Sequence, residues 1–138
     1  MLLCPVLSSV TFAFDPIYIN FQPAASPVPA GYLADGGDNY GDRGNGYSYG
    51  WDGDNFEVRD RNIDPDQRYD TLNHFQKSGT DSWEIELPNG TYDVDVVFGD
   101  PGYTDQVNDM NVEGIMLCLL YTSPSPRDLS TSRMPSSA

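Results

Sequence analysis

The sequence predicts an all-β fold, and both its composition and its residue alternation support this class. Glycine, proline and tyrosine are abundant, at 13, 11 and 9 residues, while lysine occurs once, at residue 77. Such a composition forms turns and strands more readily than helices. Apolar and polar side chains also alternate over residues 82–87 and 91–98, which is the period of a half-buried strand.

The N-terminal half predicts one strand followed by long connections. Residues 17–21, IYINF, alternate and form the first expected strand. Residues 22–30 carry three prolines and are expected to be extended without pairing centrally in a sheet. Residues 31–53 are rich in Gly, Asp and Tyr and are expected to form a long loop. Residues 59–69 are charged and typical of turns.

The second half predicts a hairpin. Residues 72–76 form a short expected strand. Residues 82–87 and 91–98 flank Pro88-Asn89-Gly90, a strong turn sequence, so they are expected to pair as antiparallel strands. Trp83, with the other odd-numbered apolar residues of its segment, is expected to face the core. Residues 110–112 are expected to open a further strand.

Residues 118–138 read as translated sequencing-library DNA. The run CLLYTSPSPRD, residues 118–128, back-translates into a transposase end followed by an adapter. The run SRMPSSA, residues 132–138, back-translates in the same frame into the far end of that adapter. A segment of this origin is excluded from fold reasoning. We therefore expect it to have no native role and to extend as coil, apart from residues 119–121, which could continue a strand.

This tail sets the expected domain organisation. Residues 1–16 are expected to be an upstream linker or strand remnant, and residues 17–117 a single domain truncated at its C-terminus, which implies neighbouring domains in a longer parent chain. Cys118 belongs to the tail, so it gives no evidence of a disulfide with Cys4.

The net charge of −14 limits the classes of binding partner that are expected. A basic footprint is needed for nucleic acid and for anionic membrane surfaces, so neither is expected. The sequence has no transmembrane segment, and residues 1–14 lack the charged start and cleavage site of a signal peptide. An acidic, solvated surface fits an extracellular or cell-surface protein.

Tyrosines and one tryptophan gather in the expected loops. A flat aromatic ring matches the apolar face of a sugar, while Asp and Asn can satisfy its hydroxyl groups. In residues 47–51, YSYGW, alternation places three rings on one face, although packing in a core would explain the same pattern. The candidate ligand-binding residues from these loops are Tyr47, Tyr49, Trp51, Tyr32, Tyr40, Asp100 and Tyr103.

Metal and catalytic sites have weaker support. Asp52 and Asp54 are the candidate calcium ligands, but no bidentate Glu follows at the EF-hand distance. No other cofactor is expected. His74, the single histidine, is accompanied by no nucleophile motif, so it is expected to be structural and the domain not to be an enzyme.

Several segments together resemble the malectin-like, galactose-binding-like modules of large secreted bacterial proteins. They are INFQPA (residues 19–24), YGDRGNGYSYGW (40–51), RYDTLNHFQ (68–76), WEIELPNGTYDVDVVFGDP (83–101) and NVEG (111–114). The resemblance covers residues 17–114. It implies a jelly-roll-like antiparallel β-sandwich that binds carbohydrate through loop aromatics at one end.

The resemblance and the loop aromatics together predict a non-catalytic module that binds a polysaccharide or oligosaccharide. Two alternatives stay open. The domain could be the accessory N-terminal part of a polysaccharide-active esterase or lyase, since related modules precede such enzymes. It could also be a structural spacer or adhesion domain. The sequence of a longer gene would distinguish the binding module from the accessory part of an enzyme. Binding to a panel of polysaccharides would distinguish the binding module from a structural spacer.

Overall fold

The computed structural model describes residues 15–77, 79, 81–103, 107–120 and 129–135, and this part of the chain is all-β, as predicted. Eleven strands are accompanied by one short helix, α1 (Gln67–Asp70), whose N-cap Asp66 accepts a hydrogen bond from the Arg68 amide. The strands are β1 (Ile19–Phe21), β2 (Leu33–Asp35), β3 (Gly41–Asp42), β4 (Ser48–Trp51), β5 (Val58–Asp60), β6 (Thr71–Asn73), β7 (Trp83–Ile85), β8 (Thr91–Val97), β9 (Val107–Val112), β10 (Ile115–Leu120) and β11 (Leu129–Pro135).

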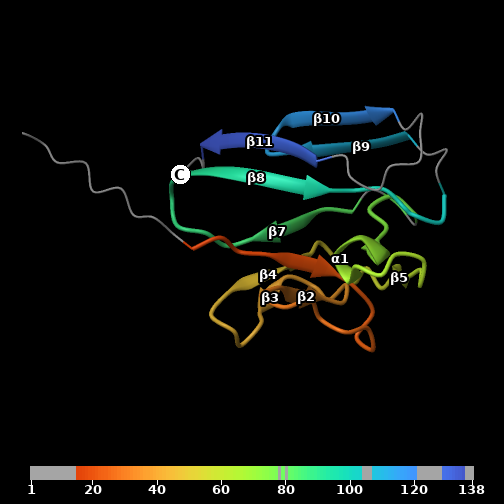
Figure 1. Ribbon diagram of the computed structural model, residues 1–138. Helices are drawn as coiled ribbons and strands as arrows, with labels where there is room; N and C mark the ends of the chain where they lie inside the picture. The colour runs from red at the N-terminus through yellow and green to blue at the C-terminus, as the bar shows by residue number, and fades with distance from the viewer. Residues whose placement is uncertain (1–14, 78, 80, 104–106, 121–128, 136–138) are drawn as a thin grey trace, which may run out of the picture.

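The strands form several small sheets. One three-stranded antiparallel sheet has the order β3-β4-β7, and the two-stranded sheets are β1-β2, β5-β6, β8-β11 and β9-β10. The β1-β2 pair is parallel and the others are antiparallel. In Figure 1, β1 to β6 gather in one layer, β8 to β11 in another, and β7 runs between them. The finer prediction of a jelly-roll sandwich stays a prediction. Within the described residues, no helix has the length and apolar character needed to span a membrane.

The core of the first layer is a cluster of aromatic rings. Trp51 and Tyr49 are 1% and 2% exposed. The ring of Trp51 lies 4.5 Å from that of Phe75 and 5.7 Å from that of Phe21, measured between centroids. Trp83 of β7 packs edge-on against Phe21 at 5.5 Å. Tilted and edge-to-face contacts of this kind add to the stabilisation from burial.

Buried polar side chains tie the same layer together. Asn20 donates from Nδ2 to Gln22 Oε1 and to Thr71 Oγ1, each at 2.8 Å, and so joins β1 to β6. Asn55 donates to the carbonyl of His74 at 2.9 Å, and Asn73 donates back to the carbonyl of Asn55 at 2.8 Å. Among the described side chains, every buried nitrogen and oxygen has a hydrogen-bond partner. The layer is therefore specified by hydrogen bonds as well as by apolar packing.

The expected loop at residues 31–53 was predicted wrongly, because β2, β3 and β4 all lie within it. These strands are two to four residues long, and glycines interrupt them. Gly50 inside β4 has a φ of 142° and faces the side chain of Arg43, which leaves no room for a Cβ atom. β2 and β3 are too short to show an alternation, and the alternation of residues 47–51 was interpreted as a ring-bearing face within a loop because glycines surround it.

The expected hairpin across Pro88-Asn89-Gly90 was also wrong as a pairing. β7 pairs with β4, through Tyr49↔Ile85 and Trp51↔Trp83, while β8 pairs with β11. The alternation itself is observed, since Trp83 and Ile85 are half-buried and Glu84 and Glu86 are exposed. Alternation specifies which face of a strand is buried but not which strand lies beside it, and the aromatic cluster draws β7 to β4.

The expectation of coil in the tail is wrong for residues 129–135, which form β11 and pair with β8 along seven residues. Residues 118–120 continue β10, as anticipated for part of that region. An open strand edge offers backbone donors and acceptors to any extended segment, whatever its side chains. Residues 1–14, 121–128 and 136–138 lie outside the described residues.

Deleting residues 118–138 is expected to leave the aromatic core unchanged. β11 forms its ladder with β8, in a sheet separate from the one that holds Trp51 and Trp83. The tryptophan fluorescence maximum and the midpoint of thermal unfolding should therefore match those of the full chain. A red-shifted emission or a clear drop in midpoint after the deletion would show that the tail contributes to the fold.

Ser26→Ala is expected to lower stability in a pH-dependent way. The Ser26 hydroxyl donates to Asp60 Oδ2 at 2.6 Å, and this hydrogen bond lowers the pKa of Asp60 from its ordinary 3.8. The carboxylate therefore stabilises the fold above about pH 3.8, and this contribution disappears as pH falls through the lower folded-state pKa. In urea unfolding, the difference in free energy of unfolding between the wild type and Ser26→Ala should be largest at neutral pH and smaller in acid. A constant difference would reject this assignment.

Candidate functional site

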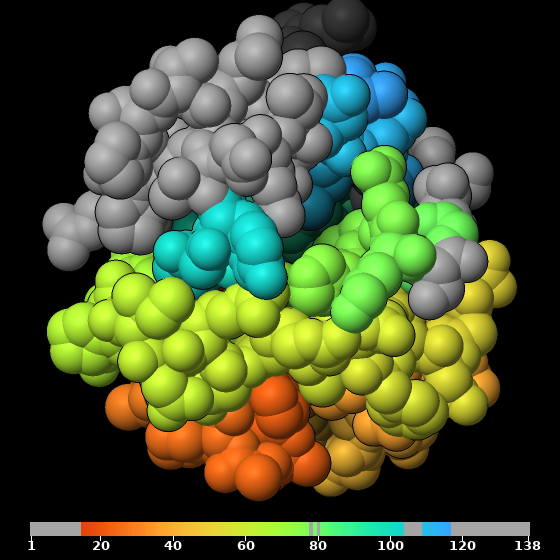
Figure 2. All heavy atoms as spheres, turned by 90° about the vertical axis from the view of Figure 1, so that its right-hand side faces the viewer, coloured from red at the N-terminus to blue at the C-terminus, as the bar shows by residue number. Residues whose placement is uncertain are grey.

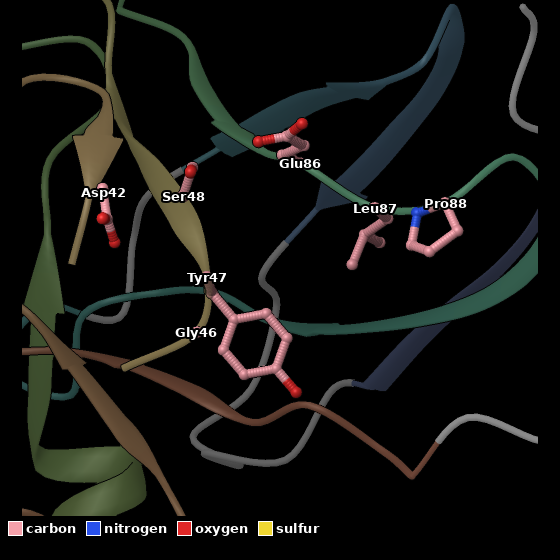
Figure 3. Close-up of a pocket in the computed structure, with 7 residues that line it drawn as sticks. All are labelled: Asp42, Gly46, Tyr47, Ser48, Glu86, Leu87 and Pro88. Atoms are coloured by element: carbon pink, nitrogen blue, oxygen red, sulfur yellow. The ribbon is translucent and has the colours of Figure 1, made fainter. Parts of the chain in front are cut away.

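The candidate site is a shallow cavity at the tip of the β3-β4 hairpin. Its volume is about 530 Å³. Figure 3 shows the residues that line it, which are Asp42, Gly46, Tyr47, Ser48, Glu86, Leu87 and Pro88. We call it the Tyr47 pocket. It combines one aromatic ring, two carboxylates and the hydroxyl groups of Ser48 and Tyr47, which is the mixture of an apolar face and polar rim that small polar ligands require.

Local hydrogen bonds order the hairpin side of the pocket. Asp42 Oδ1 accepts from the Gly44 amide at 2.8 Å, and Asn45 Oδ1 accepts from the Tyr47 amide at 3.1 Å. Both are Asx turns, in which a side chain replaces a backbone partner. Gly44 and Gly46 have φ values of 68° and 92°, which glycine adopts without a steric penalty. The sequence DRGNGY therefore builds a defined tip that carries Tyr47.

The opposite side follows β7. The Glu86 amide donates to the Ser48 carbonyl at 2.9 Å, which continues the β4-β7 register beyond Ile85. In this register Ser48 lies opposite Glu86 and Tyr47 lies opposite Leu87. Figure 3 shows the Glu86 carboxylate directed toward the Ser48 side of β4, with Leu87 and the Tyr47 ring extending the other way. A ligand in this pocket would thus meet an acidic side and an apolar side.

The rings of YSYGW separate along β4. Tyr49 and Trp51 are buried, so the expectation that they stack on ligand is wrong: a ring that is 1–2% exposed offers no free face. The Tyr49 hydroxyl is also engaged, donating to the Ala34 carbonyl at 3.2 Å. Tyr47 precedes the strand and is half-buried. Of these three rings, Tyr47 is the one that lines a cavity.

Tyr32 lines a second depression, of about 570 Å³. It is shared with Pro29, Ala30, Pro65, Asp66, Gln67 and Arg68. Its polar groups are already paired, because Arg68 Nε donates to Asp66 Oδ1 at 2.9 Å and this pairing raises the pKa of Arg68. The Tyr32 ring packs 5.1 Å from Tyr18. Tyr40 is 41% exposed and belongs to neither cavity.

Asp100 and Tyr103 lie together, but in a different place from Tyr47. Arg61 Nε donates to Asp100 Oδ1 at 2.9 Å and Nη2 donates to Oδ2, which raises the pKa of Arg61. The same guanidinium lies 5.2 Å from the centroid of the Tyr103 ring. Figure 2 shows the corresponding contact between the cyan segment near residue 100 and the yellow-green segment near residue 60.

This pairing changes the interpretation of Asp100. Its side chain is 3% exposed and accepts from Arg61 and from the Gly102 amide, so the expectation that it holds a sugar hydroxyl is wrong. Tyr103 keeps an exposed ring, at 56%. His74 Nδ1 donates to the Glu57 carbonyl at 2.7 Å, and its Nε2 lies 4.0 Å from Asp100. His74 and Arg61 thus join the loop after β8 to the β5-β6 pair.

Asp52 and Asp54 are both exposed. Among the described residues, no group of three or more His, Cys, Asp or Glu side chains is placed to hold a metal ion. In the described part of the chain, Asp52 and Asp54 therefore belong to no such group.

Sequence reasoning missed Asp42, Ser48, Glu86 and Leu87 as pocket residues. The YGW and WEI segments each alternate, but the β4-β7 pairing that joins them spans more than thirty residues of sequence. The register of the β4-β7 pairing places Glu86 beside Ser48, so predicting that pairing would have identified Glu86. The turn sequence at residues 88–90 predicted a different pairing, between residues 82–87 and 91–98. No protein-family model, no curated protein and no solved structure was found to match this chain.

Proposed function

We propose that this protein binds carbohydrate without turning it over, and that the Tyr47 pocket is the binding site. The single observation that supports this is the position of Tyr47: the ring leaves the core and lines an open cavity beside Asp42, Ser48 and Glu86. The ring matches the apolar face of a pyranose, and the carboxylates and hydroxyl accept from or donate to its hydroxyl groups. The ordered hairpin tip limits the entropy lost on binding.

Tyr47→Ala is expected to weaken glycan binding about tenfold, which corresponds to about 1.4 kcal/mol, because it removes the stacking face. Affinity electrophoresis against a panel of neutral, acidic and amino-sugar polysaccharides measures the effect. Tyr47→Phe keeps the ring and should bind like the wild type. Tyr103→Ala is the matched control, since it removes an exposed ring far from the pocket along the chain.

The outcomes are distinct. Retardation lost in Tyr103→Ala and kept in Tyr47→Ala would move the site to the Arg61–Asp100 cluster. Retardation by no glycan would reject carbohydrate binding and favour the structural spacer.

A further inference from the structure

The Tyr47 pocket is acidic. Asp42 and Glu86 are the charged residues of its lining, and both side chains are exposed. One oxygen of Asp42 accepts from the Gly44 amide, which fixes the carboxylate at the pocket rim. A sugar that carries a carboxylate or sulfate would meet like charge at this rim, and that interaction is repulsive.

The nearest basic residue in the sequence is turned away. Arg43 follows Asp42 directly, yet its Nη2 donates to the carbonyls of Asp38 and Asn39 at 3.0 and 2.9 Å. Its guanidinium lies 5.1 Å from the centroid of the buried Tyr49 ring. These contacts hold the charge on the inner side of the hairpin.

The other basic residues before residue 78 are also committed. Arg59 and Lys77 both pair with Glu57, at 2.6 and 2.8 Å, and Arg61 pairs with Asp100. Arg68 pairs with Asp66 at 2.5 Å. Among these described basic residues, none offers an anionic ligand at the Tyr47 pocket a cation that is not already paired.

We infer that the Tyr47 pocket selects a glycan unit that carries a free ammonium group, an amino sugar, over neutral and acidic sugars. This inference rests on the proposed function. The ammonium group would face the acidic side of the pocket, to which Asp42 of β3 and Glu86 of the segment after β7 each contribute a carboxylate. The ring face of the same unit would lie on Tyr47. An N-acetylated unit of the same shape lacks that charge.

Isothermal titration with three hexamers tests the selection: glucosamine, N-acetylglucosamine and galacturonic acid, in buffered salt at about pH 5.5. We expect the glucosamine hexamer to bind about five- to tenfold more tightly than the N-acetylated one, as two exposed charge contacts allow. The galacturonic acid hexamer should bind most weakly. Asp42→Asn/Glu86→Gln should abolish the preference, while the amide oxygen introduced at position 42 can still accept from the Gly44 amide.

The strong negative charge of the whole chain makes a matched control necessary. Asp52→Asn/Asp54→Asn removes the same charge from an exposed segment that does not line the pocket, and it should keep the preference. Equal losses in the two double variants would mean diffuse attraction and would overturn the inference. Equal binding of glucosamine and N-acetylglucosamine, or tighter binding of galacturonic acid, would overturn it too while leaving carbohydrate binding intact. No binding of any hexamer or polysaccharide would reject the proposed function itself.

Discussion

Asp35→Ala is expected to abolish cooperative folding. The Asp35 side chain is buried, and its Oδ1 accepts from Trp51 Nε1 at 2.8 Å and from the Gly37 amide at 2.9 Å. Its Oδ2 accepts from Trp83 Nε1 at 2.9 Å. Alanine leaves three donors without this acceptor, and each buried donor left unpaired costs about 1–3 kcal/mol. Because the stability of a small domain is about 5–15 kcal/mol, a loss of this size approaches the total.

Asp35→Asn distinguishes the contributions of the two carboxylate oxygens to stability. The amide oxygen can still serve Trp51 and Gly37, but the amide nitrogen then faces the Trp83 indole, donor against donor. Trp83→Phe removes that donor. The double variant Asp35→Asn/Trp83→Phe should therefore lose less stability than the sum of the single variants. Guanidinium unfolding followed by far-UV circular dichroism measures all three, and an unchanged midpoint for Asp35→Ala would contradict the prediction.

Gly37→Ala is expected to cause the second-largest loss. Gly37 has a φ of 99°, and a Cβ atom there would lie 1.9 Å from the carbonyl oxygen of Asn55. The positive φ alone costs roughly 1–2 kcal/mol for a residue with a side chain. The clash adds to this cost because the obstacle is backbone: the Asn55 amide donates to the Gly37 carbonyl at 2.7 Å, so relief means breaking that bond.

The neighbouring glycine provides the control. A Cβ atom on Gly36 would come no closer than 4.0 Å to the carbonyl oxygen of Gln22, and no positive φ is found there. The free energy of unfolding of Gly36→Ala should therefore lie within about 1 kcal/mol of the wild-type value, as for other substitutions at conformationally compatible glycines. Equal midpoints for Gly36→Ala and Gly37→Ala would show that the backbone contact at Asn55 yields easily.

Composition and alternation determined the fold class and the burial of individual strands. The scarcity of helix-forming residues predicts the all-β chain that is observed, and the alternation of residues 82–98 predicts which faces of β7 and β8 turn inward. The first strand was also predicted, although β1 covers Ile19–Phe21 and not the full five residues. These are local properties, so the sequence contains them without reference to the rest of the chain.

Tertiary structure decided the partners and the site. Alternation could not predict that β7 pairs with β4. Strands pair through backbone hydrogen bonds, which any strand edge of suitable direction can form. The same three-ring motif, YSYGW, fits a binding platform and a core equally well. Tyr49 and Trp51 are buried because the fold supplies partners for both rings. Trp51 packs against Phe21 and donates to Asp35, and Tyr49 packs against Trp83. Tyr47 was left at the pocket because the strand, and with it the packed face, begins one residue later.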